Sequence, residues 1–364
     1  MNVSDPLALL SALVEVPSPS GEEAACADLV VSFCRASGLS VERVGQSLLI
    51  RLGCADGPRL LLVSHLDTVP AGDGWDADPH DGAWRSDRLV ARGANDAKAS
   101  VASMLWTART LRATELEGEL LLALTACEET SNAGMTAVLE HLSGTEVDGA
   151  VVGEPTGLEV VRAQAGLVVL EADWSGESCH AAHVAYVEHE NALVVAAEEL
   201  SAFGPFRTVG AEHELIGTST IAPTVFTSGA RHNVVPCAAR AVFDARLAPP
   251  VDAQACVRLL ESRLPRAEIR VRSQRLRAVD TPANHPLVRA SLEAAGRARA
   301  IGSNTLSDMA LLAGIPAVKC GPGETQRSHT RNEYVTAGEV RAGVGFYTAL
   351  VPLALAALSK AVAP

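Results

Sequence analysis

The chain has 364 residues, enough for about two domains, and 48% of them are hydrophobic, which supplies ample core. This size excludes a small scaffold held together by disulfides. The formal net charge is −13 and Lys and Arg form no cluster, which excludes nucleic acid and anionic membrane as partners. The eight cysteines include no C-x-x-C pair, which argues against a disulfide framework or a zinc ribbon.

The first residues, Met1-Asn2-Val3-Ser4-Asp5-Pro6, lack the basic region, apolar stretch and cleavage site of a secretory signal. The longest apolar runs are interpreted as too short and too interrupted to span a bilayer. Together with the scattered cysteines, these features predict a cytoplasmic protein without a membrane partner.

The first part of the chain alternates between helical and extended patterns. Ser4 is predicted to cap a helix that begins at Pro6. Further helices are expected at Glu22–Ala36, Ala99–Leu111 and Met135–Leu142, and buried strands at Leu48–Leu52, Leu60–Val63, Gly118–Thr125 and Gly149–Val152. This alternation predicts an α/β fold, in which a site lies beyond the carboxyl ends of the strands.

From about residue 167 the pattern changes to half-buried alternation, which is typical of an α+β module. Its expected strands are Leu167–Trp174, Ser219–Phe226 and Ala241–Arg246, and its expected helices are Asn191–Phe203 and Ala253–Leu264. The first pattern then returns, with a strand at Ile315–Val318 and a helix at Ala337–Leu358. The predicted organisation is therefore a larger domain, 1–166 and 276–364, with a smaller domain, 167–275, inserted into it.

Polar side chains follow the ends of the predicted core strands. His65 and Asp67 point to the same face of an extended segment, where Asp67 could orient the imidazole as a metal ligand. Alone, this pair also fits an ordinary solvated strand end. Asp96 lies in a glycine-containing turn before a helix and alone also fits an N-cap.

Three more acids and a second histidine extend this set. Glu128 and Glu129 directly follow a buried strand, and adjacent like charges there require a cation or a raised pKa. Glu154 follows another core strand, and His329 comes late in the chain. Apart from the orienting Asp67, two histidines and four acids, with few Lys or Arg nearby, form an oxygen and nitrogen ligand set that suits Zn²⁺ or a similar ion.

In order and approximate spacing, these motifs resemble the acetylornithine deacetylase and succinyl-diaminopimelate desuccinylase family of metallo-amidohydrolases, over essentially the whole chain. The resemblance implies a mixed-sheet catalytic domain with helices on both faces and an inserted dimerisation and lid domain. It also implies two divalent ions, Zn²⁺ or Co²⁺, bridged by Asp96. His65 and Glu154 would complete one metal site, and Glu129 and His329 the other.

The resemblance assigns further roles. Glu128 is the expected general base, and His180 is expected to reach the partner subunit's site and stabilise the oxyanion. Asn233 and Arg246 lie in segments similar to the substrate-gripping part of the lid, and the planar guanidinium of Arg246 suits a substrate carboxylate. The main chain around Gly323 could bind a carboxylate, although a plain turn explains this glycine equally well.

Within the family, a Glu at position 154 favours deacylases of amino-acid derivatives over dipeptidases and carboxypeptidases. Residues 303–308 and 317–324 look most like the acetylornithine deacetylase branch. The expected activity is hydrolysis of N-acetyl-L-ornithine, or of N-succinylornithine or N-acetylcitrulline, in arginine biosynthesis, by a homodimer formed through the inserted domain.

Two kinds of alternative stay open. The first is another enzyme on the same metal core: an aminoacylase, a carrier-protein-linked lysine or ornithine hydrolase, a succinyl-diaminopimelate desuccinylase or a dipeptidase. The second is a catalytically inactive binding protein, against which the intact Glu128 argues.

Overall fold

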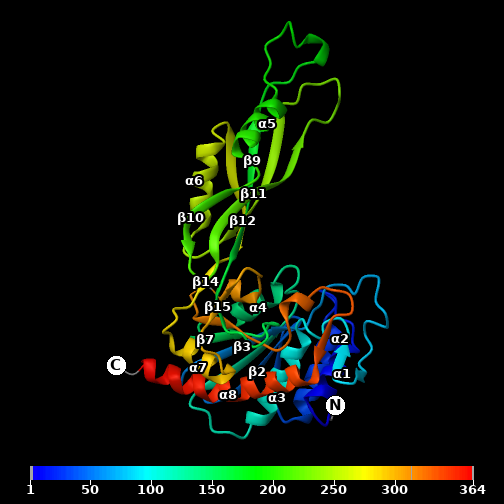
Figure 1. Ribbon diagram of the computed structural model, residues 1–364, viewed down its shortest axis with the longest axis vertical. Coiled ribbons are helices and arrows are strands. Elements are labelled where there is room, and N and C mark those ends of the chain that lie inside the picture. The colour runs from blue at the N-terminus through cyan, green and yellow to red at the C-terminus, as the bar shows by residue number, and fades with distance from the viewer. Residues whose placement is uncertain (1–2, 313, 363–364) are drawn as a thin grey trace. The chain divides into compact units, whose positions relative to one another are not determined.

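The computed structural model describes residues 3–312 and 314–362 and has a mixed α/β architecture (Figure 1). Its α-helices are α1 (Pro6–Val14), α2 (Ala24–Ala36), α3 (Lys98–Leu111), α4 (Ala133–His141), α5 (Ala192–Phe203), α6 (Ala253–Arg263), α7 (Pro286–Ala295) and α8 (Ala337–Val362). Short 3₁₀ helices are η1 (Ala181–His183), η2 (Asp308–Leu311) and η3 (Thr325–Arg327).

The strands form three sheets. The largest follows the order β1 (Val41–Val44), β2 (Ser47–Gly53), β6 (Glu119–Thr125), β3 (Arg59–His65), β7 (Gly149–Val152), β16 (Ala317–Lys319), β8 (Val161–Gln164) and β14 (Val279–Asp280), with β15 (Ile301–Ser303) beside β8. A small sheet contains β17 (Tyr334–Thr336), β5 (Arg88–Val90) and β4 (Trp84–Arg85). The third sheet follows the order β10 (Arg207–His213), β11 (Gly217–Ser228), β12 (Ala238–Leu247), β9 (Gly166–Ser175) and β13 (Ala267–Leu276).

The chain divides into two compact units. The first runs up to Arg162, resumes over Asp280–Gly302 and continues from Ser307, and the second takes in Ala163–Val279 and Ser303–Leu306. The second unit thus begins four residues before the predicted boundary at 167 and extends four residues beyond the one at 275.

In the first unit, four neighbouring strands of the large sheet run in the same direction. β6, β3, β7 and β16 are parallel, so His65 lies opposite Thr125 and Val152 lies opposite Lys319. Every residue of β6 is buried, as expected for a strand covered on both faces. The segments after β3, β6, β7 and β16 therefore leave the sheet at one shared edge.

The first helix begins differently from the sequence prediction. Asp5, not Ser4, is its N-cap, because the Asp5 carboxylate accepts a hydrogen bond of 2.8 Å from the backbone N–H of Ala8. Pro6 then occupies the first helical position, where a missing N–H costs nothing. The assignment of Ser4 as the cap was wrong by one residue.

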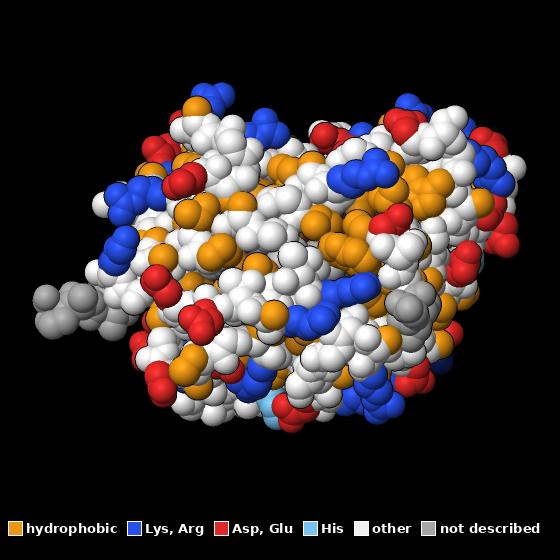
Figure 2. Space-filling view, turned by 90° about the horizontal axis from the view of Figure 1, so that it is seen from below, with side chains coloured by type: hydrophobic (Ala, Val, Ile, Leu, Met, Phe, Trp, Pro, Cys, Tyr) orange, Lys and Arg blue, Asp and Glu red, His pale blue; other side chains and the backbone are white. Residues whose placement is uncertain are grey.

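The terminal helix α8 corrects the prediction that no apolar run could span a bilayer. Within the described residues, Ala337–Lys360 is long and apolar enough to do so by length and composition. One side of α8, which includes Phe346, Tyr347 and Leu350, is buried, and the helix packs on α3 and α7. The face seen from below Figure 1 mixes hydrophobic, basic and acidic side chains (Figure 2). α8 therefore serves as a core helix of the first unit.

The second unit has its own core. Along β9 buried residues alternate with half-buried ones, as in a sheet with one covered face. Helices α5 and α6 pack on this sheet, and Trp174, Phe203 and Phe243 lie buried between them. The sequence predicted no disulfide framework, and each of the eight cysteines of the chain is a free thiol.

Candidate metal centre

Loops at the shared edge of the large sheet present most of the predicted ligands. His65 is the last residue of β3, Glu128 and Glu129 follow β6, and Glu154 follows β7. Asp96 lies two residues before α3, and His329 follows η3. Parallel neighbouring strands explain why side chains so distant in the sequence leave the sheet together.

The two oxygens of the Asp96 carboxylate face two different histidines. Oδ1 lies 3.4 Å from Nε2 of His65, and Oδ2 lies 3.6 Å from Nε2 of His329. An oxygen of Glu154 lies 3.9 Å from the same atom of His65, and an oxygen of Glu129 lies 2.9 Å from the same atom of His329. Asp96 therefore stands between two groups, each made of one histidine and one glutamate.

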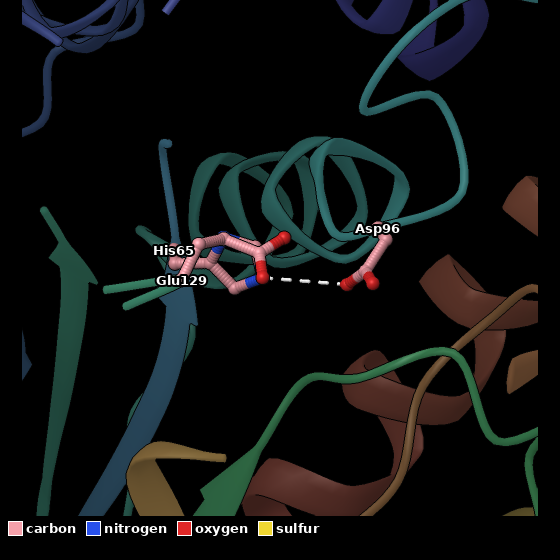
Figure 3. A group of neighbouring side chains, drawn as sticks. All are labelled: His65, Asp96 and Glu129. Atoms are coloured by element: carbon pink, nitrogen blue, oxygen red, sulfur yellow. Dashed lines mark ion pairs between the residues drawn. The ribbon is translucent and has the colours of Figure 1, made fainter. Parts of the chain in front are cut away.

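The donor atoms of His65, Asp96 and Glu129 all lie within 4.8 Å of one another. Figure 3 shows these three side chains directed toward one another, with the ion pair between His65 and Asp96 drawn as a dashed line. Imidazole nitrogens and carboxylate oxygens are the donors that zinc and similar divalent ions take. These three residues therefore fit a divalent cation in both chemistry and spacing.

Electrostatics indicate that this cluster needs positive charge. Burial, reinforced by the Asp96 carboxylate, raises the pKa of Glu154 to about 8. The pKa of Glu128 lies well above its usual value because of burial and of neighbouring acids, including Glu154 and Asp308, although His65 opposes the shift. Burial alone would lower the pKa of His65, but the Asp96 carboxylate and its acidic neighbours raise it well above the usual value. A field that favours an extra proton here also favours a cation.

Asp67 supports the two adjacent acids more directly than it supports His65. Its Oδ1 accepts a hydrogen bond of 3.0 Å from the backbone N–H of Glu128, and its Oδ2 accepts one of 3.1 Å from that of Glu129. Nδ1 of His65 lies 2.8 Å from the Asp67 carbonyl oxygen but 3.6 Å from its carboxylate. The predicted orientation of His65 by this carboxylate is therefore corrected: the nearer partner is the backbone carbonyl.

Three buried residues near the cluster were missed as site residues. Glu333 accepts hydrogen bonds from the backbone of the Asp96 loop, and Asp308 accepts them at both ends of the loop that carries Glu128. Lys319 is 2% exposed and lowers the pKa of Glu154, so the prediction that few cations lie nearby was incomplete. A lysine within an apolar strand, and an Asp in the 303–308 stretch already noted, were the available signals.

Gly323 also belongs to this region. Its φ is +88°, and a Cβ at this position would lie 2.3 Å from Oδ1 of Asn95, so only glycine fits there. Its carbonyl oxygen accepts a hydrogen bond of 2.6 Å from the N–H of Gly157. These contacts explain the glycine through close packing of the main chain, whatever its role toward a substrate.

The other predicted residues, His180, Asn233 and Arg246, belong to the second unit. Nδ1 of His180 accepts a hydrogen bond of 3.1 Å from the N–H of Ala182, so a neutral ring carries its proton on Nε2. Asn233 is exposed, and its carbonyl oxygen accepts a hydrogen bond from the N–H of Ala181. Arg246 is half exposed and pairs with Asp244 through two hydrogen bonds of 2.7 and 3.0 Å. The guanidinium of Arg246 thus already binds one carboxylate through two parallel hydrogen bonds.

Known proteins share both the sequence and the fold. A Mycobacterium tuberculosis protein provisionally named succinyl-diaminopimelate desuccinylase DapE is 30% identical over 93% of this chain and 96% of its own length. The acetylornithine deacetylase of Myxococcus xanthus is 32% identical over 76% of this chain and 75% of its own length.

Among solved structures, the Bacillus subtilis YXEP protein is described as a dinuclear metal binding peptidase from the M20 family. It has a TM-score of 0.75 at 18% identity and covers 96% of this chain and 98% of its own. Its likeness shows the fold. The profile of Peptidase family M20/M25/M40 matches residues 61–352, which span all the predicted metal ligands. With these relatives and this site geometry, the chain belongs to the M20/M25/M40 peptidase family and is a hydrolase of amide bonds.

Proposed function

We propose that the protein hydrolyses the amide bond of an N-acyl amino acid with the help of two divalent ions, Zn²⁺ or Co²⁺. The observation that carries this proposal is the Asp96 carboxylate, whose two oxygens face His65 and His329 separately. One ion would be held by His65, Glu154 and Asp96, and the other by His329, Glu129 and Asp96. When bound, such a pair polarises an amide carbonyl and makes water more acidic.

The side chains around this centre have separate tasks. Glu128 takes a proton from the attacking water and returns it to the departing amine, so that amide and water become carboxylate and free amine. A raised pKa suits a carboxylate that must both accept and release this proton near neutral pH. Asp67 holds Glu128 and Glu129 in place through their backbone N–H groups.

Three residues of the second unit have proposed roles toward the substrate. His180 offers an Nε2–H donor that suits a tetrahedral oxyanion, and in a homodimer it would act on the partner's substrate. Arg246 would exchange its bond to Asp244 for the substrate carboxylate, with Asn233 and the main chain at Gly323 as further contacts. Within the described residues, all strongly exposed large hydrophobic side chains lie in this unit: Val184, Tyr186, Val187, Leu193, Val194, Phe206, Val225, Phe226 and Val234. Such exposure supports a homodimer through this unit.

We infer that the substrate is N-acetyl-L-ornithine or a close analogue, such as N-succinylornithine or N-acetylcitrulline, and that the product serves arginine biosynthesis in the cytoplasm. A second candidate is succinyl-diaminopimelate, because a relative provisionally named for its desuccinylation aligns with 93% of the chain. The two candidates share the metal centre and differ in the acyl group and side chain. Small apolar differences between substrates are worth about 1–3 kcal/mol, whereas a polar group that is read by the site discriminates far more.

One experiment tests the activity and the base together. The purified protein is loaded with Zn²⁺ or Co²⁺ and assayed with acetylornithine, succinylornithine, acetylcitrulline, succinyl-diaminopimelate and dipeptides. The Glu128→Gln variant is expected to bind two ions as the wild type does and to lose turnover by at least about a hundredfold. The proposal would be contradicted if the wild type hydrolysed none of these substrates, or if the variant kept the turnover of the wild type.

A further inference from the structure

Glu333 ties the His329 segment to the loop that presents Asp96. It lies four residues after His329, directly before β17, and is 1% exposed. Its Oε1 accepts hydrogen bonds of 2.9 Å from the backbone N–H groups of both Asn95 and Asp96. Its own carbonyl oxygen accepts a hydrogen bond of 3.0 Å from the N–H of Ala91, so main chain and side chain join the same two segments.

The second carboxylate oxygen has different partners. Oε2 accepts a hydrogen bond of 2.6 Å from Nη1 of Arg92 and one of 3.2 Å from the N–H of Gly93. Arg92 is itself 3% exposed. A buried pair of this kind contributes little net stability, because desolvation offsets the attraction between the charges. The bonds of Oε1 satisfy two backbone N–H groups of the Asp96 loop and fix where this loop lies relative to residue 333.

The same segment also contacts the side chain of Asp96. Nε2 of His329 lies 3.6 Å from Oδ2 of Asp96. Main chain and side chain of Asp96 are thus both contacted by residues 329–333. The distance between Asp96 and His329 depends on this connection, since the two lie more than 200 residues apart in sequence.

We propose that Glu333 is a positioning residue that holds Asp96 between His65 and His329, and that it thereby sets the affinity for the second of two divalent ions. This inference rests on the proposed function. Residues that orient a metal ligand commonly change metal affinity by about 10- to 100-fold when they are replaced. Glu333 acts through Asp96 and takes no part in bond making or breaking.

The test measures binding of Zn²⁺ and Co²⁺ by calorimetry to the metal-free protein, without substrate. Glu333→Gln leaves one acceptor oxygen for two sets of donors. With Arg92 present that oxygen is expected to pair with the guanidinium, so that the N–H groups of Asn95 and Asp96 face the NH2 group, and the affinity for the second ion is expected to fall by about 10- to 100-fold. Glu339→Gln is the matched control, because the Glu339 carboxylate also pairs with an arginine, Arg327. Its other hydrogen bonds come from Thr336 and not from the Asp96 loop. This control is expected to bind both ions as the wild type does.

A second pair of variants removes the buried charges, in case Glu333→Gln alone does not fold. In Arg92→Met with Glu333→Gln, the amide oxygen can still accept from Asn95 and Asp96, and binding of both ions is expected. In Arg92→Met with Glu333→Met, no acceptor remains for the N–H groups of Asn95 and Asp96, and the affinity for the second ion is expected to fall. Equal affinities in these two double variants, or wild-type affinity in Glu333→Gln, would overturn the inference. A wild-type protein that binds fewer than two ions would instead contradict the proposed function.

Discussion

Exchanging the side chains of Asn132 and Asp308 tests how the loop of the general base is held. Asp308 is 1% exposed and accepts hydrogen bonds of 2.8 Å from Oγ1 of Thr125 and 3.0 Å from Nδ2 of Asn132. Thr125 ends β6 and Asn132 precedes α4, so the two donors bracket the loop that carries Glu128. The carboxylate of Asp308 thus closes this loop from one side.

The single variants should be costly. In Asp308→Asn, one oxygen still accepts from Thr125, but the new amide meets the amide of Asn132, which costs about 1–3 kcal/mol for a lost buried hydrogen bond. In Asn132→Asp, two carboxylates meet in a buried site, which costs about 3 kcal/mol or more. The double variant has an amide at 308 and a carboxylate at 132, so both hydrogen bonds can form again. It is expected to recover to within about 1 kcal/mol of the wild type.

The free energy of unfolding is measured in urea for the wild type, both single variants and the double variant. These costs imply a coupling energy of at least about 3 kcal/mol between the two positions. Turnover should follow the same order, because displacement of a catalytic group by about 1 Å can cost about a hundredfold. If the two single effects add to within about 0.5 kcal/mol, the described hydrogen bond does not hold the loop and the reasoning fails.

Other expectations concern stability. A Cβ on Gly134 would lie 2.3 Å from a backbone nitrogen, whereas one on Gly345, inside α8, meets nothing within 4 Å. Thermal unfolding should therefore show Gly134→Ala destabilised by about 1–3 kcal/mol and Gly345→Ala stabilised by about 0.5–1 kcal/mol; the reverse order would contradict the packing. Burial alone would raise the pKa of Glu339, but hydrogen bonds from Arg327 and Thr336 lower it below 4.5. Its stabilisation is present above pH 4.5 and lost as pH falls through the lower folded pKa. Glu339→Gln should thus cost about 1 kcal/mol in urea at pH 7 and less in acid, and a cost independent of pH would refute this.

Several elements followed from local patterns alone. The strand predicted at Gly149–Val152 has these bounds in the structure, and the helix predicted at Ala253–Leu264 ends one residue earlier. The strand is a short continuous apolar run, which indicates burial on both faces, and the helix repeats apolar residues at helical spacing, which indicates burial on one face. Neither α7 nor β13 was predicted as a separate element. For β13 the reason is that its residues alternate between exposed and half-buried, without a fully buried face.

The candidate site divides in the same way. The residue types of a divalent metal centre, from His65 to His329, were readable because polar side chains directly follow apolar strands. Local patterns could not pair Glu333 with the Asp96 loop or Asp308 with Asn132, since hydrogen bonds between residues so far apart leave no periodic trace in the sequence.

The sequence by itself determined which donors this protein has: two histidines and four acids, each next to a core element. Only the tertiary structure decided their arrangement, in which one oxygen of Asp96 faces each histidine and the Asp67 carbonyl, not its carboxylate, is the nearer partner of His65. The physical reason is that parallel strand order brings distant loops to one edge, and atomic distances there depend on packing across the whole sheet.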